Sequence, residues 1–545
     1  MHFSHLSIGG GIVGIETLIS SINNIELHLK KKNKKFFDKK KISFAIIDSK
    51  PENIPGGVAY GFESSKYGFF NNPLRLSPNK LQKWIFNKKK QNHLVRYIEK
   101  YGGESGKAWL NENKKLLGSR SKKNFREIYF PRALANFWME EKLIQLLKKI
   151  NVLNKKYSIK IKVQFIKGEV IGLSSKTSDF TRILFKGNRY KILKHKIRKN
   201  NFKILDFKSN RKFKKGKIHS ITQCISLGLP PPKELATKIC QKNFNYIRDF
   251  YFSGGTANLI NKLIKIKKKK RNKQIIIYFI GYKAGLLEPL TELKYLIKRK
   301  NINAKMLCSS PNLLGIQKAQ KSKNIKKYKL NFFKKNKINK IKTSKMLLSL
   351  IIQEFNIAEK KGYNKYDAWT EILNRKILNK SIKNFNSYEK RLYKNFVFYK
   401  IRALTRFTYP STIESRDELV SDGILSAKKE TVTKVNSFKN KLYVYVKNKH
   451  KKYCCDLVVN VSGPLIAKKL KNDWPLIKSI KNKKVRLLQG GFDVDENFKV
   501  IGARNIYVPG FLANSFNPER KTIIKAILEN SNKAGIDIAK KLLMI

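Results

Sequence analysis

Three glycines near the start of the chain have the spacing of a phosphate-binding turn. Gly9, Gly11 and Gly14 form a Gly-x-Gly-x-x-Gly pattern within the segment SIGGGIVGIETLIS. In such a turn the first glycine permits a sharp bend, the second lets the backbone approach a pyrophosphate, and the third lets helix and strand pack closely. Glycines also cluster by chance in loops, so the elements around the pattern must decide between a nucleotide site and an ordinary turn.

The flanking residues predict a strand before this turn and a helix after it. HFSHLSI (2–8) has the pattern of a short strand, and apolar residues recur at helical spacing from Ile12 to Ile22. The start of such a helix offers free N–H groups and the positive end of its dipole to an anion. The next predicted strand, ISFAIIDSK, ends in Asp48, whose carboxylate suits the hydroxyls of a ribose. We therefore predict a dinucleotide site at this turn.

Other predicted strands also run into a glycine. FIKGEVIGL (165–173) and SITQCISLG (220–228) have strand patterns, and the second ends in Gly228. CCDLVVNVSG (454–463) is typical of a buried strand, and NIYVPGFLANS (505–515) runs through Gly510 toward a final helix. The Lys/Asn-rich stretches 185–218 and 313–345 are expected to form long loops.

A second strand–turn–helix unit is predicted in QIIIYFIGYKAGLLEPLTELKYL (274–296). Gly281 opens its turn and Gly285 follows, but Lys283 stands where a second glycine would allow close backbone approach. Two interpretations stay open: a nicotinamide site that has decayed into scaffold, or a lysine that itself contacts a phosphate of NADPH. The next strand ends in Ser309 and Ser310 without a carboxylate, which leaves room for a 2′-phosphate.

The order of these segments resembles flavoproteins with two dinucleotide-binding domains, most closely the family called FAD-NAD(P)-binding proteins. GGVAYGFESSKYGFFNNPLRLSP (56–78) is similar to a family stretch with an Asn-x-Pro and a Ser, here Asn71, Pro73 and Ser77, although Gly68 replaces the usual His. YFPRALANFWMEEKL (129–143) resembles the family's Pro-Arg helix start, which here contains Arg132. Residues 362–425 are similar to its helical region, and the resemblance extends from residue 6 to 540.

This resemblance implies FAD in the first domain, with Gly510 and the final helix closing over the flavin and Val170 contacting the adenine half. The predicted FAD site comprises Gly9, Gly11, Gly14, Asp48, Asn71, Ser77, Arg132, Val170, Gly228 and Gly510. The predicted NADPH site comprises Gly281, Lys283 and Gly285. Candidates for the substrate side of the flavin are Asn71, Asn72, Arg132 and Arg406.

The predicted fold class is α/β, with a discontinuous Rossmann-like FAD domain, an inserted second nucleotide-binding-type domain and a helical segment. We expect the first part of the FAD domain at 1–235 and its closing part at 450–545. An NAD(P)-binding-like domain is expected at 240–340, and a helical or substrate region at 341–449.

The composition is strongly basic, with 119 Lys and Arg against 37 Asp and Glu and a net charge of +82 over 545 residues. Most of the excess is Lys spread along the chain with Asn and Ile, residues whose codons are rich in A and T. A nucleic-acid surface would concentrate Arg and interleave aromatic residues. We therefore favour codon bias and predict no specific nucleic-acid partner.

Several other classes are disfavoured by what the sequence shows. No secretory signal is visible, and the apolar runs are far shorter than the ~20 residues of a membrane span, so we expect a cytoplasmic protein. The cysteines are scattered, and adjacent Cys454 and Cys455 should point to opposite faces of a strand, which argues against disulfides. No metal-ligand spacing is seen, and His93 and His219 lie in polar contexts typical of solvated histidines.

The leading hypothesis is an FAD-dependent oxidoreductase, an NAD(P)H-using monooxygenase that acts on a small organic substrate. The cofactor would supply the redox chemistry, and the fold would supply position and electrostatics. A flavin-binding protein without turnover is the first alternative, and a basic nucleic-acid-binding protein is a distant one. No catalytic residue can be assigned from spacing, and the substrate and oligomeric state are unknown.

Overall fold

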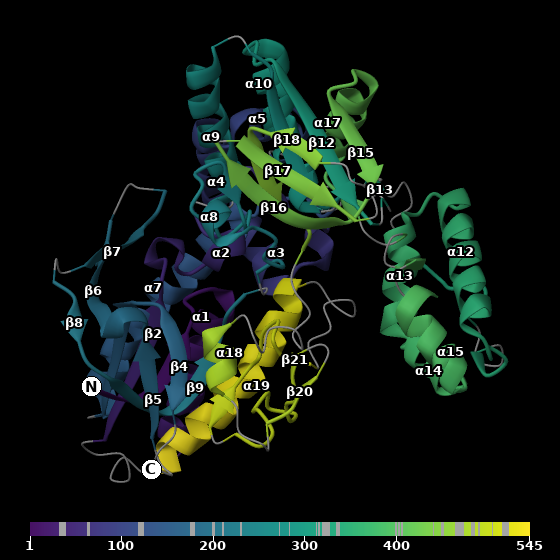
Figure 1. Cartoon of the computed structure of the whole chain (residues 1–545). Helices are drawn as coiled ribbons and strands as arrows, with labels where there is room; N and C mark the ends of the chain where they lie inside the picture. Colours follow the sequence, from purple (N-terminus) through teal and green to yellow (C-terminus); the bar gives the residue numbers. More distant parts are fainter. Residues whose placement is uncertain are drawn as a thin grey trace.

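The computed structural model contains two α/β units and a group of helices (Figure 1). It describes residues 1–31, 40–62, 66–117, 125–157, 159–174, 180–198, 202–209, 212–228, 231–271, 273–282, 284–311, 313, 317–318, 328–333, 338–397, 400–401, 404, 407–439, 441–447, 452–463, 474–480, 485–488, 491–503, 505–514 and 523–544.

Parallel strands form the centre of the first sheet. Their order is β22–β9–β1–β2–β3, and every neighbouring pair is parallel. The strands are β1 (His2–Ile8), β2 (Lys41–Asp48), β3 (Lys160–Lys167), β9 (Ile218–Ile225) and β22 (Ile506–Tyr507). The strand–turn–helix–strand order predicted around the first glycine pattern is therefore observed.

Antiparallel strands extend this sheet on both sides. They are β4 (Val170–Ser174), β5 (Thr181–Phe185), β6 (Arg189–Ile197), β7 (Leu205–Ser209) and β8 (Lys214–Lys215). Strand β5 pairs with β9, and β6 pairs with β3, β7 and β8. The prediction of a long loop over 185–218 is wrong, because this stretch contains β6, β7 and β8. Tyr190 and Leu193 of β6 are buried, whereas Lys194 and Lys196 are exposed.

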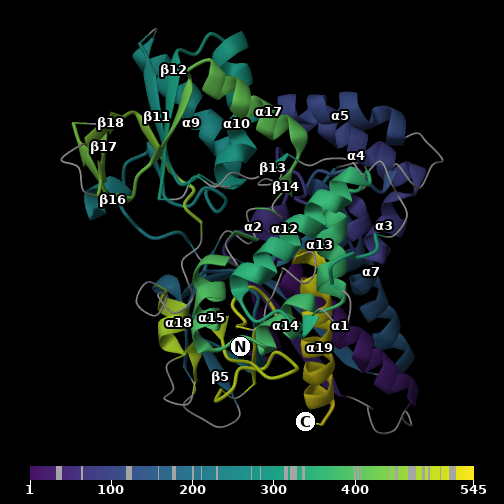
Figure 2. The same ribbon diagram turned by 90° about the vertical axis from the view of Figure 1, so that its right-hand side faces the viewer.

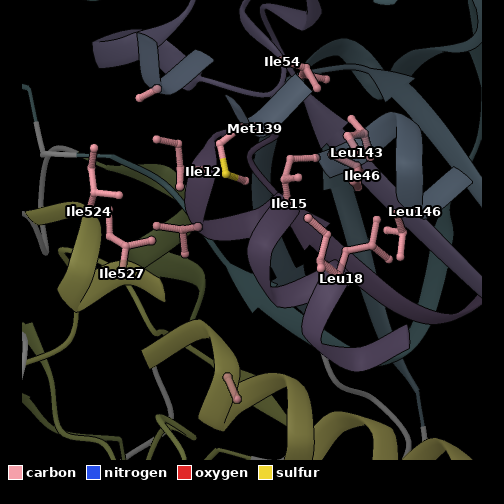
Figure 3. Packing of buried hydrophobic residues seen from close by; sticks show 14 of the residues in the cluster. Ile12, Ile15, Leu18, Ile46, Ile54, Met139, Leu143, Leu146, Ile524 and Ile527 are labelled. Atoms are coloured by element: carbon pink, nitrogen blue, oxygen red, sulfur yellow. The ribbon is translucent and has the colours of Figure 1, made fainter. Parts of the chain in front are cut away.

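Three long helices belong to the first unit, and the first of them contacts the other two. They are α1 (Ile12–Lys31), α7 (Ala133–Tyr157) and α19 (Ile523–Met544). Figure 3 shows Ile15 and Leu18 of α1 between the side chains of α7 and β2, with Ile524 and Ile527 of α19 nearby. Shorter helices on this unit are η2 (Pro51–Asn53), α2 (Gly57–Tyr60), η3 (Leu74–Leu76), α3 (Asn79–Ile85), α4 (Lys88–Tyr101) and α5 (Gly103–Leu117).

Four neighbouring strands of the second sheet have the same order as β9–β1–β2–β3 of the first. Its order is β10–β19–β11–β12–β15, and every neighbouring pair is parallel. The strands are β10 (Tyr246–Ile247), β11 (Ile275–Ile280), β12 (Ala304–Ser310), β15 (Leu425–Lys429) and β19 (Leu457–Asn460). In each unit a glycine turn and a helix join the two strands at the centre of the sheet, β1 to β2 and β11 to β12.

An antiparallel sheet and four helices complete the second unit. The strands are β16 (Val432–Phe438), β17 (Lys441–Val446) and β18 (Lys452–Cys455), and the helices are α8 (Lys238–Gln241), α9 (Gly255–Lys270), α10 (Ala284–Arg299) and α17 (Pro410–Ser421). We expected the closing part of the first domain to begin at 450. The pairing instead places β15 and β19 beside β11 and β12, so residues 425–460 lie with the second sheet.

The helices between β12 and α17 have their own apolar core, which includes Leu347, Ile351 and Phe355. They are α12 (Ser344–Lys360), α13 (Lys365–Asn374), α14 (Ile377–Lys383), α15 (Ser387–Leu392) and η5 (Tyr393–Val397). Figure 2 shows them outside both sheets. Short elements elsewhere are β13 (Gln317–Lys318), β14 (Phe407–Thr408), α18 (Pro475–Ser479), β20 (Leu487–Leu488) and β21 (Gly491–Phe492).

The predicted fold class is confirmed. The first sheet is discontinuous, because β22 and α19 follow the whole second unit in the sequence and yet pack on β9 and α1. The second unit and the helices are inserted between β9 and β22.

Candidate functional site

The turn after β1 has a backbone that only glycine adopts readily. Gly9 has a φ of +107°, and its N–H donates to the carbonyl of Ile47 at 2.7 Å. A Cβ on Gly9 would lie 2.9 Å from the carbonyl oxygen of Ser226. The turn therefore bends sharply at the carboxyl ends of β1, β2 and β9.

The other two glycines of the pattern allow two close approaches. A Cβ on Gly14 would lie 2.3 Å from the carbonyl oxygen of Gly9, so helix and strand meet here without space for a side chain. A Cβ on Gly11 would lie 3.3 Å from the Cα of Gly57, a residue that itself has a φ of +69°. At the start of α1 the backbone of Gly11 therefore faces the backbone of Gly57 with no side chain between them, as the binding of a pyrophosphate requires.

Asp48 is attached to this turn through both carboxylate oxygens. Its Oδ2 accepts from the Gly10 N–H at 2.6 Å, and its Oδ1 accepts from the Lys50 N–H at 2.7 Å. Burial raises the pKa of Asp48, and the hydrogen bond from Gly10 opposes that rise. The carbonyl of Asp48 also accepts from the N–H of Gly168 at 3.0 Å, which brings the start of β4, with Val170, to the end of β2.

Ser226 contacts the turn directly and was missed by sequence reasoning. Its Oγ donates to the Gly9 carbonyl at 2.6 Å and lies 2.8 Å from the Ile8 carbonyl. Gly228, which we had predicted from this strand end, is exposed, and a Cβ on it would meet nothing within 4 Å among the described residues. A small polar residue directly after a buried strand was the available signal.

The C-terminal segment reaches the same place. A Cβ on Gly510 would lie 3.2 Å from Cγ2 of Val13 and 3.8 Å from the carbonyl oxygen of Leu227. Gly510 thus lies at the start of α1 beside the end of β9. From the 56–78 segment, Ser77 is buried, whereas Asn71 is exposed and Asn72 is half-buried.

Arg132 lies at the boundary between the two units. Its Nη1 donates to Oε2 of Glu288 at 2.8 Å, and its Nε donates to the carbonyl of Phe69 at 3.0 Å. A Cβ on Gly68 would lie 3.2 Å from the Arg132 side chain, so glycine leaves the space that the guanidinium occupies. Arg406, another predicted candidate, lies outside the described residues.

The second glycine turn is closed in the same way as the first. Gly281 has a φ of +114°, and its N–H donates to the carbonyl of Ser309 at 2.8 Å. A Cβ on Gly281 would lie 2.6 Å from the Cα of Ser462, and one on Gly285 would lie 3.1 Å from Cβ of Val461. Lys283, which we predicted to contact NADPH, is outside the described residues.

A buried acidic network lies at the end of β12. Oγ of Ser309 donates to Oε2 of Glu430 at 3.2 Å, and the Tyr453 hydroxyl lies 3.1 and 2.9 Å from the two Glu430 oxygens. The prediction that β12 ends without a carboxylate holds for that strand, but Glu430, directly after the neighbouring strand β15, supplies one. Tyr453 and Ser309 engage Glu430 in the interior of the unit.

The histidines and the adjacent cysteines considered from the sequence lie in other parts of the described structure. His93 packs against the rings of Phe137 and Phe202 at centroid distances of 4.8 and 5.3 Å, and burial lowers its pKa, so the prediction of a solvated His93 is wrong. His219 stacks on His2 at 4.9 Å. Cys454 is exposed and Cys455 is buried, as predicted. The described residues contain no group of three or more metal-ligating side chains.

Within the described ranges, none of the helices has the length and apolar character that a membrane crossing needs.

The residues around the first turn fit a dinucleotide such as FAD. The start of α1 is free of side chains at two glycines, Asp48 lies half-buried beside it, and the ends of β1, β2 and β9 converge there. The second turn fits less completely, because Leu286, which is fully buried, stands where the third glycine of the pattern would be.

No family model and no curated protein matches the chain. Several solved structures are similar to it in fold. Bacillithiol disulfide reductase Bdr (YpdA) from Bacillus cereus is 10% identical with a TM-score of 0.41, over 99% of this chain and 100% of that one. Ornithine hydroxylase (PvdA) from Pseudomonas aeruginosa is 10% identical with a TM-score of 0.46, over 100% and 99%. DfoA bound to FAD, a cadaverine monooxygenase from Erwinia amylovora, is 9% identical with a TM-score of 0.42, over 100% and 94%. These three proteins are named as a reductase, a hydroxylase and a monooxygenase, so their names do not indicate one reaction for this chain.

Proposed function

We propose that the protein is an FAD-dependent oxidoreductase that uses NADPH in a monooxygenase reaction on a small organic substrate. One observation carries the proposal. In each of two units with similar strand order, the first glycine of a turn donates a hydrogen bond from its N–H to a carbonyl at the end of the neighbouring strand. The two hydrogen bonds concerned are Gly9 N–H to Ile47 O at 2.7 Å and Gly281 N–H to Ser309 O at 2.8 Å. Two such turns in one chain suit two dinucleotides.

Each group at the first turn has a binding role in this proposal. The N–H groups at the start of α1 bind the pyrophosphate, and Asp48 accepts from ribose hydroxyls. Val170 lies near the adenine half, and Gly510 lies near the flavin half. The bound flavin would pass two electrons from NADPH to oxygen, so that one oxygen atom enters the substrate and the other leaves as water.

For the second turn we propose that Lys283 binds a phosphate of NADPH. The N-terminal end of α10 repels a cation and attracts an anion, so a nucleotide phosphate would be held by the helix and the lysine together. Glu430 does not oppose this, because Ser309 and Tyr453 already engage it in the interior.

The experiment is an absorption spectrum of the purified protein, followed by NADPH addition under exclusion of air. We expect flavin bands, and bleaching faster with NADPH than with NADH. The variant Lys283→Ala should slow reduction by NADPH more than reduction by NADH. Colourless protein that does not take up added FAD would refute the proposal.

A flavin-binding protein without turnover is the second candidate. Leu286 in place of the third glycine favours it, because a buried leucine keeps α10 farther from β11 than glycine would. Flavin bands without bleaching by either nucleotide would support this alternative.

A further inference from the structure

Helix α10 presents two buried carboxylates to the first unit. Glu288 and Glu292 are four residues apart, so they lie on one face of the helix, and only 6% and 5% of their surfaces are exposed. Oε1 of Glu292 accepts from the Ser105 N–H of α5 at 2.7 Å. Helix α10 also begins at the second glycine turn, with Gly285 in its first turn.

Arg132 provides the opposite side of this contact. Its Nη1 donates to Glu288 at 2.8 Å, and the exposed fractions of the two side chains are 12% and 5%. Burial alone would lower the pKa of Arg132, but the Glu288 carboxylate outweighs it and raises that pKa. The Tyr251 ring lies 5.5 Å from the guanidinium carbon and interacts with both charged groups.

The guanidinium has its orientation fixed from the first unit. Its Nε donates to the Phe69 carbonyl at 3.0 Å, and the Phe69 ring stacks on Tyr409 at 4.5 Å. A Cβ added to Gly68 would lie 3.2 Å from the Arg132 side chain. A planar fork that is bonded to a fixed carbonyl can accept a carboxylate from only a narrow range of directions.

A buried ion pair contributes little net stability, because desolvation of the two charges offsets their attraction. It does penalise any arrangement that separates the charges without giving them new partners. The pair between Arg132 and Glu288 is therefore better suited to fixing an orientation than to strengthening the fold.

We propose that Arg132 and Glu288 form a positioning pair that sets the distance between the two nucleotides. The inference rests on the proposed function. On one side the pair holds Phe69, which leads along the chain to Asn71, a residue of the predicted FAD site. On the other side it holds α10 one turn beyond the second glycine turn. Hydride transfer depends on contact between two rings, and a misplacement of ~1 Å can cost about a hundredfold in rate.

The test compares Glu288→Gln with a matched control, Glu418→Gln, at a carboxylate of α17 that pairs with α10. Glu418→Gln removes ion pairs from Glu418 to Lys294 and Lys298 of α10, at a side chain that is 42% exposed. We expect Glu288→Gln to lower the limiting rate of flavin reduction at saturating NADPH by about tenfold to a hundredfold. Flavin content, NADPH affinity and reduction by dithionite should not change. Glu418→Gln should stay within about twofold of the parent protein.

Arg132→Lys gives a second variant that keeps the charge. One ammonium replaces the planar fork, so it cannot bond Phe69 and Glu288 with the same geometry, and we expect the same defect. A limiting rate within twofold of the parent in both variants would overturn the positioning role.

A measurement without NADPH separates this proposal from the proposed function. Hydrogen exchange of the flavin-loaded protein should become faster at 68–70 and at the Ser105 amide in Glu288→Gln, and should not change in Glu418→Gln. If NADPH fails to reduce the parent protein, the proposed function fails, and faster exchange would still support the fixed contact. Unchanged exchange in Glu288→Gln overturns the positioning pair in either case.

Discussion

Glycines of the first unit tolerate a side chain to very different degrees. An added Cβ would be 2.3 Å from a carbonyl oxygen at Gly14 and 3.3 Å from a Cα at Gly11, and it would meet no described neighbour at Gly228. We expect Gly14→Ala to lower the free energy of unfolding by about 3 kcal/mol, since overpacked backbone cannot move aside cheaply. Thermal unfolding measures this loss, and Gly228→Ala should unfold like the parent.

The Gly11 position separates cofactor binding from folding. Gly11→Ala has room for its methyl group with a small shift of Gly57, so we expect a folded protein. The methyl group would stand where the backbone should meet the pyrophosphate, so the flavin should be lost or strongly weakened. Absorbance of the purified variant tests this, and stoichiometric flavin in Gly11→Ala would argue against the assignment.

Glu140 makes stability depend on pH. Burial raises its pKa to about 7, and its Oε1 accepts from the Leu205 N–H at 2.7 Å. The folded state therefore keeps a proton that the unfolded chain releases near pH 4.5, so this contribution is full below that pH and is lost as pH rises through about 7. The parent protein should lose about 3 kcal/mol of its free energy of unfolding between pH 5 and 8, and Glu140→Gln should not show this loss.

Denaturant unfolding of the parent and Glu140→Gln across this pH range measures the difference. Glu99→Gln, at an exposed carboxylate of α4, should follow the parent curve. Parallel curves for the parent and Glu140→Gln would show that Glu140 does not titrate in this range.

The sequence predicts well those site residues whose role depends on elements that are adjacent in the chain. Gly9 and Gly14 follow from spacing between one strand and one helix, and Asp48 follows from the end of the next strand. Ser226 could not be found in this way, because its hydrogen bond to Gly9 joins positions 217 residues apart. The contact of Arg132 with Glu288 could not be found for the same reason, since the two residues lie 156 positions apart.

Among the elements, α1 and α19 make the closest helix contact of the first unit. A Cβ on Gly535 of α19 would lie 2.6 Å from Cβ of Ser20, and Oγ of Ser20 donates to Oδ1 of Asn532 at 2.7 Å. We expect Gly535→Leu to lower the free energy of unfolding by about 2–3 kcal/mol, because the helices must move apart. Lys533→Leu, at an exposed position of the same helix, is the matched control for thermal unfolding.

Element prediction failed where composition and pairing disagree. The lysine-rich 185–218 stretch has the composition of a solvated loop, yet β6 pairs with β3 and β7 through its backbone. Strand β6 lies near one end of the sheet, and its Lys194 and Lys196 are exposed, so it needs few apolar side chains. Strands β15 and β19 belong to the second sheet through pairing between residues far apart in the sequence, which local patterns do not show.

For the whole molecule, the charge of +82 predicts weak and unspecific attraction to polyanions. We expect duplex DNA to bind without sequence preference and to dissociate as salt rises. A protein held only through several phosphate contacts loses about three to five decades of affinity between 50 and 200 mM salt. Fluorescence anisotropy with two unrelated duplexes measures this. Selective binding that survives 200 mM salt would favour the nucleic-acid alternative.

The contact between α1 and α19 also determines when the protein can fold during synthesis. Ser20 and Asn532 are 512 residues apart, so the ribosome must synthesise the residues between them before α1 meets its partner. The second unit, which is contiguous from β10 to β19, can mature while the first still exposes the apolar side of α1. Such a nascent chain would depend on a chaperone, and a product that stops before residue 523 would aggregate even though it contains both glycine turns.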